Sequence, residues 1–272
     1  MIYVQLMGGL SNCMFQISTA LVLGWENNDE VIVSEWTQSI TERKEKEKFW
    51  KKTIFKRINR VNSRPPSITR IYREPNYLYN KIPYTKNMQL FGYYQSPKYF
   101  DKYKDKLLDI FLEYKHEIQN YLDNIMNNIS NKPKISIHVR RQDYLKLQHC
   151  HIVLDDSYYE NAINKLSETL DLKKYTFLIF SDDIPWCKES QFFNNLENKH
   201  FITECNDVHE LYLMSMCDHN IIANSSYSWW GSYLNLKDHI TISPKNWFNS
   251  SLTGGKGPAR WDTLYCDGWI TV

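Results

Sequence analysis

The sequence predicts an α/β fold made of two doubly wound halves that face each other across a cleft. From residue 134 onward, short apolar runs alternate with helical patterns, which is typical of a mostly parallel sheet. The amino-terminal region shows the same order once, and an Asn- and Pro-containing segment at 127–133 separates the two regions. We therefore expect an amino-terminal half at residues 1–132 and a carboxyl-terminal half at residues 133–272.

The amino-terminal half opens with a strand–turn–helix–strand unit. A strand at residues 3–6 leads through a glycine turn to a helix, and a second strand follows at residues 31–33. Gly8 and Gly9 let backbone N–H groups approach a ligand, and the helix behind them presents its positive end to the same space. Such turns also carry glycine with no ligand nearby, so a purely structural turn is the open alternative.

A basic, proline-punctuated insertion interrupts this order between residues 39 and 87. Within it, residues 41–60 mix many cations with Trp50, Phe55 and other apolar residues at roughly helical spacing. A helix of this kind can lie on an anionic membrane surface. Alternatively, it can dock by its apolar stripe and leave its charges in water. Both interpretations are open at this point.

Regular order resumes after the insertion. We expect a strand at residues 88–94, followed by helices at 99–111 and 118–129. The carboxyl-terminal half then continues with strands at 134–139, 175–181, near 201, 220–223 and 240–243, and with helices at 157–170, 208–217 and from 228.

Composition narrows the class of protein. The chain has 272 residues, of which 42% are hydrophobic, so it can bury a large core. A net charge of +2 is too balanced to indicate a nucleic-acid binder. The six cysteines form no Cys-x-x-Cys pair, and no apolar run approaches the ~20 residues that span a bilayer. We expect a cytoplasmic protein, with peripheral membrane contact through residues 41–60 as the alternative.

Polar residues gather where the strand at 134–139 ends. His138 lies near its end, and Arg140, Arg141 and Asp143 follow it directly. Ligands of open α/β sheets bind at the carboxyl ends of strands, and a guanidinium can grip a diphosphate through two parallel hydrogen bonds. Arg140 is the candidate for that contact. The alternative is an ion pair between Arg141 and Asp143 that only closes the strand.

A second polar turn follows the strand at residues 220–223. Asn224, Ser225, Ser226 and Ser228 crowd into this turn, where hydroxyl and backbone N–H groups can cradle phosphate oxygens. A serine-rich helix cap with no ligand explains the same residues.

A third polar turn contains Ser181, Asp182 and Asp183. A carboxylate there can bind a ribose hydroxyl or a base N–H group, or it can simply cap the next helix. The chain has no Asp-x-Asp pair and no set of His or Cys residues at metal spacing beyond His149 and His151. We therefore expect no metal, and a cationic side chain must take its place.

Five separated motifs resemble a known family, the alpha-1,2-fucosyltransferases of glycosyltransferase family eleven. They occur in order along nearly the whole chain: Gly8-Gly-Leu-Ser-Asn12 with Met14-Phe-Gln16, Phe91-Gly-Tyr-Tyr-Gln-Ser96 with Tyr99-Phe100, His138-Val-Arg-Arg-Gln-Asp-Tyr144, Phe180-Ser-Asp-Asp183, and Ala223-Asn-Ser-Ser-Tyr-Ser-Trp-Trp-Gly231.

The resemblance implies a GT-B-type fold of two Rossmann-like halves, with the acceptor served by residues 1–132 and the GDP-sugar bound by residues 133–272. It implies inverting transfer of L-fucose from GDP-L-fucose to the 2-hydroxyl of a galactoside glycan, with no metal and no other cofactor. Arg140 and Asp143 would be the catalytic residues, with Arg140 on the diphosphate and Asp143 supporting the arginines. The donor-binding residues would be Gly8, Gly9, Asn12, His138, Arg141, Ser181, Asp182, Asp183, Asn224, Ser225, Ser226 and Ser228.

Two alternatives accompany this interpretation. The same fold could use another nucleotide sugar or acceptor, or the chain could bind a glycan or nucleotide without catalysis. The base that deprotonates the acceptor is not identified by the sequence, which offers Asp143, Asp155, Asp156 and Glu160 equally.

Overall fold

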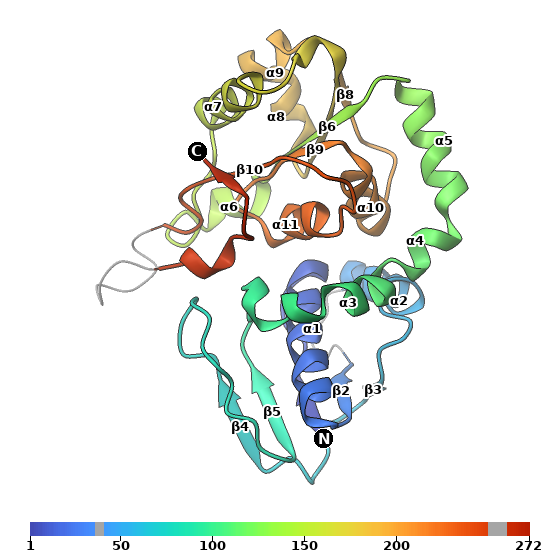
Figure 1. Cartoon of the computed structure of the whole chain (residues 1–272), viewed down its shortest axis with the longest axis vertical. Coiled ribbons are helices and arrows are strands. Elements are labelled where there is room, and N and C mark those ends of the chain that lie inside the picture. The colour runs from blue at the N-terminus through green and yellow to red at the C-terminus, as the bar shows by residue number, and fades with distance from the viewer. Residues whose placement is uncertain (36–40, 250–259) are drawn as a thin grey trace. The chain divides into compact units, whose positions relative to one another are not determined.

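The computed structural model describes residues 1–35, 41–249 and 260–272, apart from the side chains of Thr41 and Glu42 (Figure 1). Residues 39 and 40 of the expected insertion lie outside this description. The chain divides into two compact units. The first unit comprises Met1–Glu117 and Arg260–Cys266, and the second comprises Ile118–Ala259 and Asp267–Val272.

This division differs from the expected boundary after residue 132. Helix α5 (Gln119–Ile129) packs on α10 (Asp207–Met216) and therefore belongs to the second unit. Residues 260–266 belong to the first unit, where the Thr263 side chain accepts a hydrogen bond from the backbone N–H of Tyr79 (2.7 Å). These long-range contacts leave no trace in the local composition from which the boundary was predicted.

The first unit holds, among the described residues, a five-stranded parallel sheet in the order β3-β2-β1-β5-β4. Helix α1 packs on β1 and β2 through a buried side that is mostly apolar but also includes Ser11, Gln16, Ser18 and Thr19. The elements of this unit are β1 (Ile2–Val4), α1 (Leu10–Asn27), β2 (Val31–Ser34), α2 (Thr41–Lys52), β3 (Arg60–Val61), β4 (Arg70–Arg73), β5 (Met88–Phe91), α3 (Lys104–Phe111) and α4 (Glu113–Glu117), with short 3-10 turns at Pro97–Tyr99, Asp101–Tyr103 and Asp262–Leu264.

The insertion is more ordered than the sequence predicts, because it supplies both edge strands of this sheet. The broken periodicity has a physical cause: β3 is two residues long, and β4 is mostly exposed, so neither alternates apolar with polar residues. Most apolar residues of 41–60 are in the core, where Trp50 is 3% exposed and Phe55 packs against Phe111. The docked interpretation of this segment therefore fits the structure.

The second unit contains a six-stranded parallel sheet in the order β11-β10-β9-β6-β7-β8 within the described residues. Its elements are α5, β6 (Lys134–Val139), α6 (Gln142–Lys146), α7 (Asp156–Ser167), β7 (Thr176–Ser181), α8 (Ile184–Glu189), α9 (Gln191–Asn195), β8 (Lys199–Phe201), α10, β9 (His219–Ile221), α11 (Ser226–Tyr233), β10 (Thr241–Ser243) and β11 (Ile270–Thr271), with a 3-10 turn at Leu172–Lys174.

Helices cover both faces of the second sheet, as Figure 1 shows for α7, α8 and α9 on one face and α10 and α11 on the other. Ile135 and Ile137 of β6 point into a core that also contains Tyr159 and Ala162 of α7. Because strand side chains alternate, Ser136 and His138 point to the opposite face, where His138 contacts Tyr227 of α11. Two parallel-sheet α/β units, as the sequence predicts, are therefore confirmed.

Two observations from the sequence, on the cysteines and on the apolar runs, have counterparts among the described residues. All six cysteines are free thiols. No helix in the described parts of the chain is long and apolar enough to cross a membrane.

The burial of Phe55 leads to a first prediction. Phe55→Ala should lower the free energy of unfolding by ~3–5 kcal/mol, because it empties a fully buried site against Phe111. The matched control is Lys48→Ala in the same segment, whose side chain is 64% exposed, and it should change stability by less than ~0.5 kcal/mol. Urea unfolding of both variants measures the difference, and equal stabilities would contradict the docked interpretation.

Candidate functional site

The carboxyl edge of the second sheet carries three of the polar turns predicted from the sequence. They follow β6, β7 and β9, which are neighbours in the order β9-β6-β7. Because all three strands are parallel, their carboxyl ends share one edge, and residues far apart in the sequence meet there.

Arg140 lies between two carboxylates at this edge. One of its Nη atoms is 2.8 Å from Asp143 Oδ2, and the other is 3.2 Å from Asp182 Oδ2. Burial opposes the charge of Arg140, but the carboxylates outweigh this effect and raise its pKa. The side chain is 33% exposed, so a fully charged and oriented guanidinium remains accessible to a ligand.

Arg141 has a different environment, and the alternative interpretation, an ion pair between Arg141 and Asp143, is wrong. Its Nε lies 3.3 Å from Asp183 Oδ2, and its guanidinium lies 3.8 Å from the ring centre of Trp186. Only 13% of the side chain is exposed. The adjacent arginines point to different partners, and Arg141 is mostly committed to the packing between β6 and α8.

The aspartates after β7 connect this turn to the arginines. Asp182 accepts the backbone N–H of Arg141 (2.9 Å), and burial raises the pKa of its carboxyl against the opposing effect of Arg140. Asp183 caps α8 by accepting the N–H of Trp186, and Ser181 accepts the N–H of Asp183. The capping alternative therefore holds for Asp183, whereas Ser181 binds the N–H of that cap residue.

His138 lies beneath the arginine turn and is 4% exposed. Its ring centre is 5.6 Å from that of Tyr227, and its Nδ1 atom has no hydrogen-bond partner among the described residues. Burial, together with the charge of Arg140, lowers the pKa of His138 to about 3. The imidazole is therefore neutral near pH 7, with an unused polar atom.

Most of the serine hydroxyl groups in the turn before α11 form hydrogen bonds within the turn itself. The Ser225 hydroxyl accepts the N–H of Tyr227, and the buried Ser228 hydroxyl accepts the N–H of Ala223 (3.2 Å). The Asn224 amide donates to the backbone carbonyls of Ile152 and Trp247, while its buried Oδ1 has no partner among the described residues. The cap explains Ser225, the hydrogen bond from the N–H of Ala223 explains Ser228, and Ser226 has the half-buried hydroxyl of this turn.

The glycine turn lies in the first unit, and the arginine edge lies in the second. Gly8 has φ +76°, and a Cβ there would lie 2.4 Å from Asn12 Nδ2. Arg43 donates a hydrogen bond to the Gly8 carbonyl, and Gln95 donates to Asn12 Oδ1 (2.8 Å). Gly9 precedes α1 without any side-chain cap. The positive φ angle and the close contact with Asn12 thus explain glycine at position 8 without a ligand.

Tyr144 is a site residue that the sequence reasoning did not select. Its hydroxyl donates to the Asn224 carbonyl (2.8 Å), which joins the β6 turn to the β9 turn, and its ring stacks on His151 (4.1 Å between centres). The sequence feature that could have identified Tyr144 is its position at the end of the third motif, His138-Val-Arg-Arg-Gln-Asp-Tyr144. Among the described residues, no group of three or more His, Cys, Asp or Glu side chains could hold a metal ion.

Two of the aspartates considered as bases have structural partners. Asp155 caps α7 by accepting the N–H of Ser157 (3.1 Å), and Asp156 accepts the Ser190 hydroxyl (2.8 Å). Glu160 is exposed on α7.

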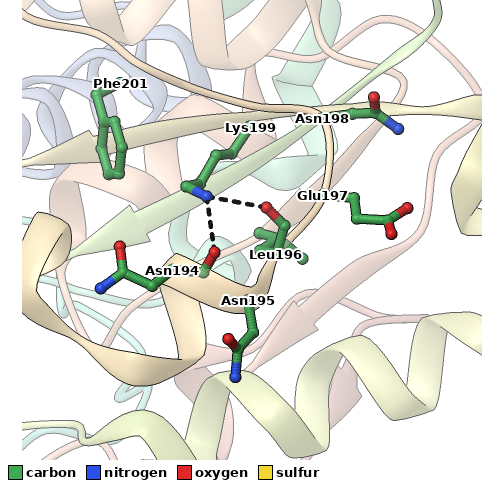
Figure 2. Close-up of a pocket in the computed structure, with 7 residues that line it drawn as sticks. All are labelled: Asn194, Asn195, Leu196, Glu197, Asn198, Lys199 and Phe201. Carbon is green, nitrogen blue, oxygen red and sulfur yellow. Dashed lines mark hydrogen bonds between the residues drawn. The ribbon is translucent and has the colours of Figure 1, made fainter.

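A separate hollow lies at the amino end of β8, lined by the residues that Figure 2 labels. Lys199 Nζ donates to the backbone carbonyls of Asn194 (3.0 Å) and Leu196 (3.1 Å), where α9 ends. A lysine in this place satisfies the free carbonyls of a helix end. The hollow is at the edge opposite to the arginine turn and has no part in the candidate site.

Sequence comparison matches the whole chain, residues 1–272, to the family model described as Glycosyl transferase family 11. An O-antigen biosynthesis glycosyltransferase, WbnK, of Escherichia coli is 36% identical over 149 residues, which are 52% of this chain and 45% of the relative. An alpha-1,2-colitosyltransferase of Escherichia coli is 38% identical over 120 residues, which are 42% of this chain and 41% of the relative. The chain therefore matches less than half the length of either relative.

Solved structures show the same fold. NodZ alpha-1,6-fucosyltransferase soaked with GDP-fucose aligns with a TM-score of 0.50 and 12% identity, covering 86% of this chain and 92% of that one. The fucosyltransferase NodZ from Bradyrhizobium aligns with a TM-score of 0.50 and 10% identity, covering 85% and 92%. The GT-B-type architecture of two parallel-sheet α/β halves is thereby confirmed.

The buried imidazole gives a prediction about stability. The pKa of His138 is about 3 when folded and ~6.5 when unfolded, so the unfolded chain binds the extra proton as pH falls. The natural chain should lose on the order of 2 kcal/mol more between pH 7.5 and pH 5 than His138→Gln does. Urea unfolding at both pH values measures this, and parallel losses in both proteins would contradict it.

Proposed function

The chain belongs to glycosyl transferase family 11, and from that premise we propose that it transfers L-fucose from GDP-L-fucose to the 2-hydroxyl of a galactoside, with inversion and without a metal ion. The single observation that supports this most is Arg140, an oriented and accessible cation at the carboxyl edge of the second sheet. In this proposal the second unit binds the GDP-sugar and the first unit serves the acceptor.

The bond changes define what the residues must do. The acceptor oxygen bonds to the anomeric carbon as the bond from that carbon to the β-phosphate oxygen breaks. GDP leaves with the electron pair, and the proton of the acceptor hydroxyl passes to a base. Negative charge grows on the diphosphate in this step, so a fixed cation stabilises the transition state more than the ground state. Arg140 supplies that cation in the proposed reaction.

Asp143 is the partner that Arg140 can exchange for a diphosphate. It is 49% exposed, whereas Asp182 is 18% exposed and also accepts the N–H of Arg141. Asp182 can thus hold the guanidinium in place while the side facing Asp143 opens to the ligand. Asp143 is, in this proposal, a supporting residue for Arg140, and neutral His138 offers a hydrogen bond to the nucleotide beside it.

A second candidate donor sugar is colitose, because the relative with 38% identity is named an alpha-1,2-colitosyltransferase. Colitose lacks one hydroxyl of fucose, and a diphosphate contact through Arg140 does not distinguish the two sugars. The proposed 1,2 linkage is common to both candidates, so a donor comparison decides between them.

The test is GDP release from GDP-L-fucose with lactose or N-acetyllactosamine as acceptor, in EDTA. We expect acceptor-dependent turnover that Arg140→Ala lowers ~10²–10³-fold, because one donor to the growing charge is lost. Arg57→Ala is the matched control, since Arg57 is a half-exposed arginine that pairs with Glu113 of the first unit.

Three outcomes contradict parts of the proposal. Turnover that EDTA abolishes and Mg²⁺ restores would rule out metal independence. Turnover with a colitose nucleotide but not with GDP-L-fucose would replace the donor. Equal activity of the Arg140→Ala and Arg57→Ala variants would remove Arg140 from the site.

A further inference from the structure

A half-buried carboxylate that the proposed reaction does not use lies at the carboxyl edge of the first sheet. Glu74 follows β4 directly and donates its backbone N–H to the carbonyl of Phe91 at the end of β5 (2.9 Å). Its carboxylate accepts the backbone N–H of Tyr93 (2.7 Å) and that of Tyr94 (3.0 Å to each oxygen). Glu74 thus connects the carboxyl end of β4 to the residues that follow β5.

The backbone beside Glu74 is shaped to admit this carboxylate. A Cβ on Gly92 would lie 2.4 Å from Glu74 Cβ and 2.7 Å from its Oε2, so only glycine fits there. Tyr94 has φ +54°, which is costly for an aromatic residue. Residues held in such unfavourable backbone conformations cluster at functional sites.

No cation neutralises Glu74 among the described residues, since none of the ion pairs there includes it. Burial raises the pKa of its carboxyl, and the two N–H donors oppose this without cancelling it. The titratable groups that face it are Tyr72, Tyr94 and Tyr99, whose own pKa values burial raises above 10. They are neutral near pH 7, so Glu74 is the one charge of this group.

Two exposed aromatic residues are connected to this carboxylate, Tyr93 through its backbone N–H and Tyr79 through ring contacts with Tyr99 and Tyr94. Tyr93 is 37% exposed and Tyr79 is 38% exposed. The Tyr79 ring centre lies 4.8 Å from that of Tyr99, which lies 5.4 Å from that of Tyr94. A carboxylate accepts hydrogen bonds from hydroxyl groups, and aromatic faces cover the C–H face of a sugar ring. The combination suits a neutral, hydroxyl-rich ligand.

Building on the transferase activity proposed above, we propose that Glu74 binds the acceptor. Its carboxylate accepts a hydrogen bond from a hydroxyl of the galactoside, whose ring packs on Tyr93 and Tyr79. The donor nucleotide does not fit this place, because the Glu74 carboxylate, which has no cation partner among the described residues, would repel its diphosphate. This places the acceptor sugar on the first unit and names the side chains that recognise it.

The test compares acceptor and nucleotide binding in the natural chain and in Glu74→Gln, which keeps the side-chain size. We expect lactose binding, followed by ligand-observed NMR without any donor, to weaken ~10–100-fold, because a hydrogen bond to a charged group is lost. GDP affinity should stay unchanged. Acceptor affinity of the natural chain should also fall as Glu74 is protonated towards acid pH, and the variant should lack this dependence.

A second pair of variants keeps the test decisive if Glu74→Gln fails to fold. Tyr93→Ala should weaken lactose binding, whereas Tyr121→Ala, a tyrosine of the second unit that is 45% exposed, should not. Unchanged lactose binding in both Glu74→Gln and Tyr93→Ala would overturn the inference, as would a parallel loss of lactose and GDP affinity. Because binding is measured without donor, absent turnover with GDP-L-fucose would count against the proposed function alone.

Discussion

The pairing of Arg140 with Asp143 and Asp182 is the interaction on which the candidate site depends. Two adjacent cations at the end of one strand repel each other, and the structure separates them by sending each to a different aspartate of the β7 turn. Three carboxylates surround the two guanidinium groups, so the edge carries no large excess of positive charge. The site therefore offers one oriented, exchangeable cation for an anion to bind.

The parallel arrangement of the strands makes this pairing possible. Val139 and Ser181 are partners in register at the ends of β6 and β7, so the residues that follow them start side by side. The first sheet uses the same geometry for a different purpose, because the ends of β4 and β5 meet on the carboxylate of Glu74. One edge thus presents a cation, and the other presents an anion bordered by tyrosines, which suits two chemically different substrates.

Much of the second unit could be predicted from the sequence, whereas the first unit could be predicted only in part. β6 alternates apolar with polar residues, β7 has an apolar run at residues 177–180, and polar turns follow both strands, so their local pattern is unambiguous. β4 consists of Arg70, Ile71, Tyr72 and Arg73 and is mostly exposed, so nothing local marks it as a strand. It forms because β5 offers an unpaired edge, which is information from elsewhere in the chain.

For the candidate site, the sequence by itself determined which polar residues end each strand, because strand periodicity and chain order are local properties. It thereby located Arg140, His138 and the aspartates correctly at one edge. The tertiary structure alone decided the partners of these residues. The Arg141 guanidinium packs on the Trp186 ring, and the Ser228 hydroxyl accepts the N–H of Ala223. The Glu74 carboxylate accepts the backbone N–H groups of Tyr93 and Tyr94. Those outcomes depend on the register between strands tens of residues apart and on burial, and neither is encoded in any short stretch of residues.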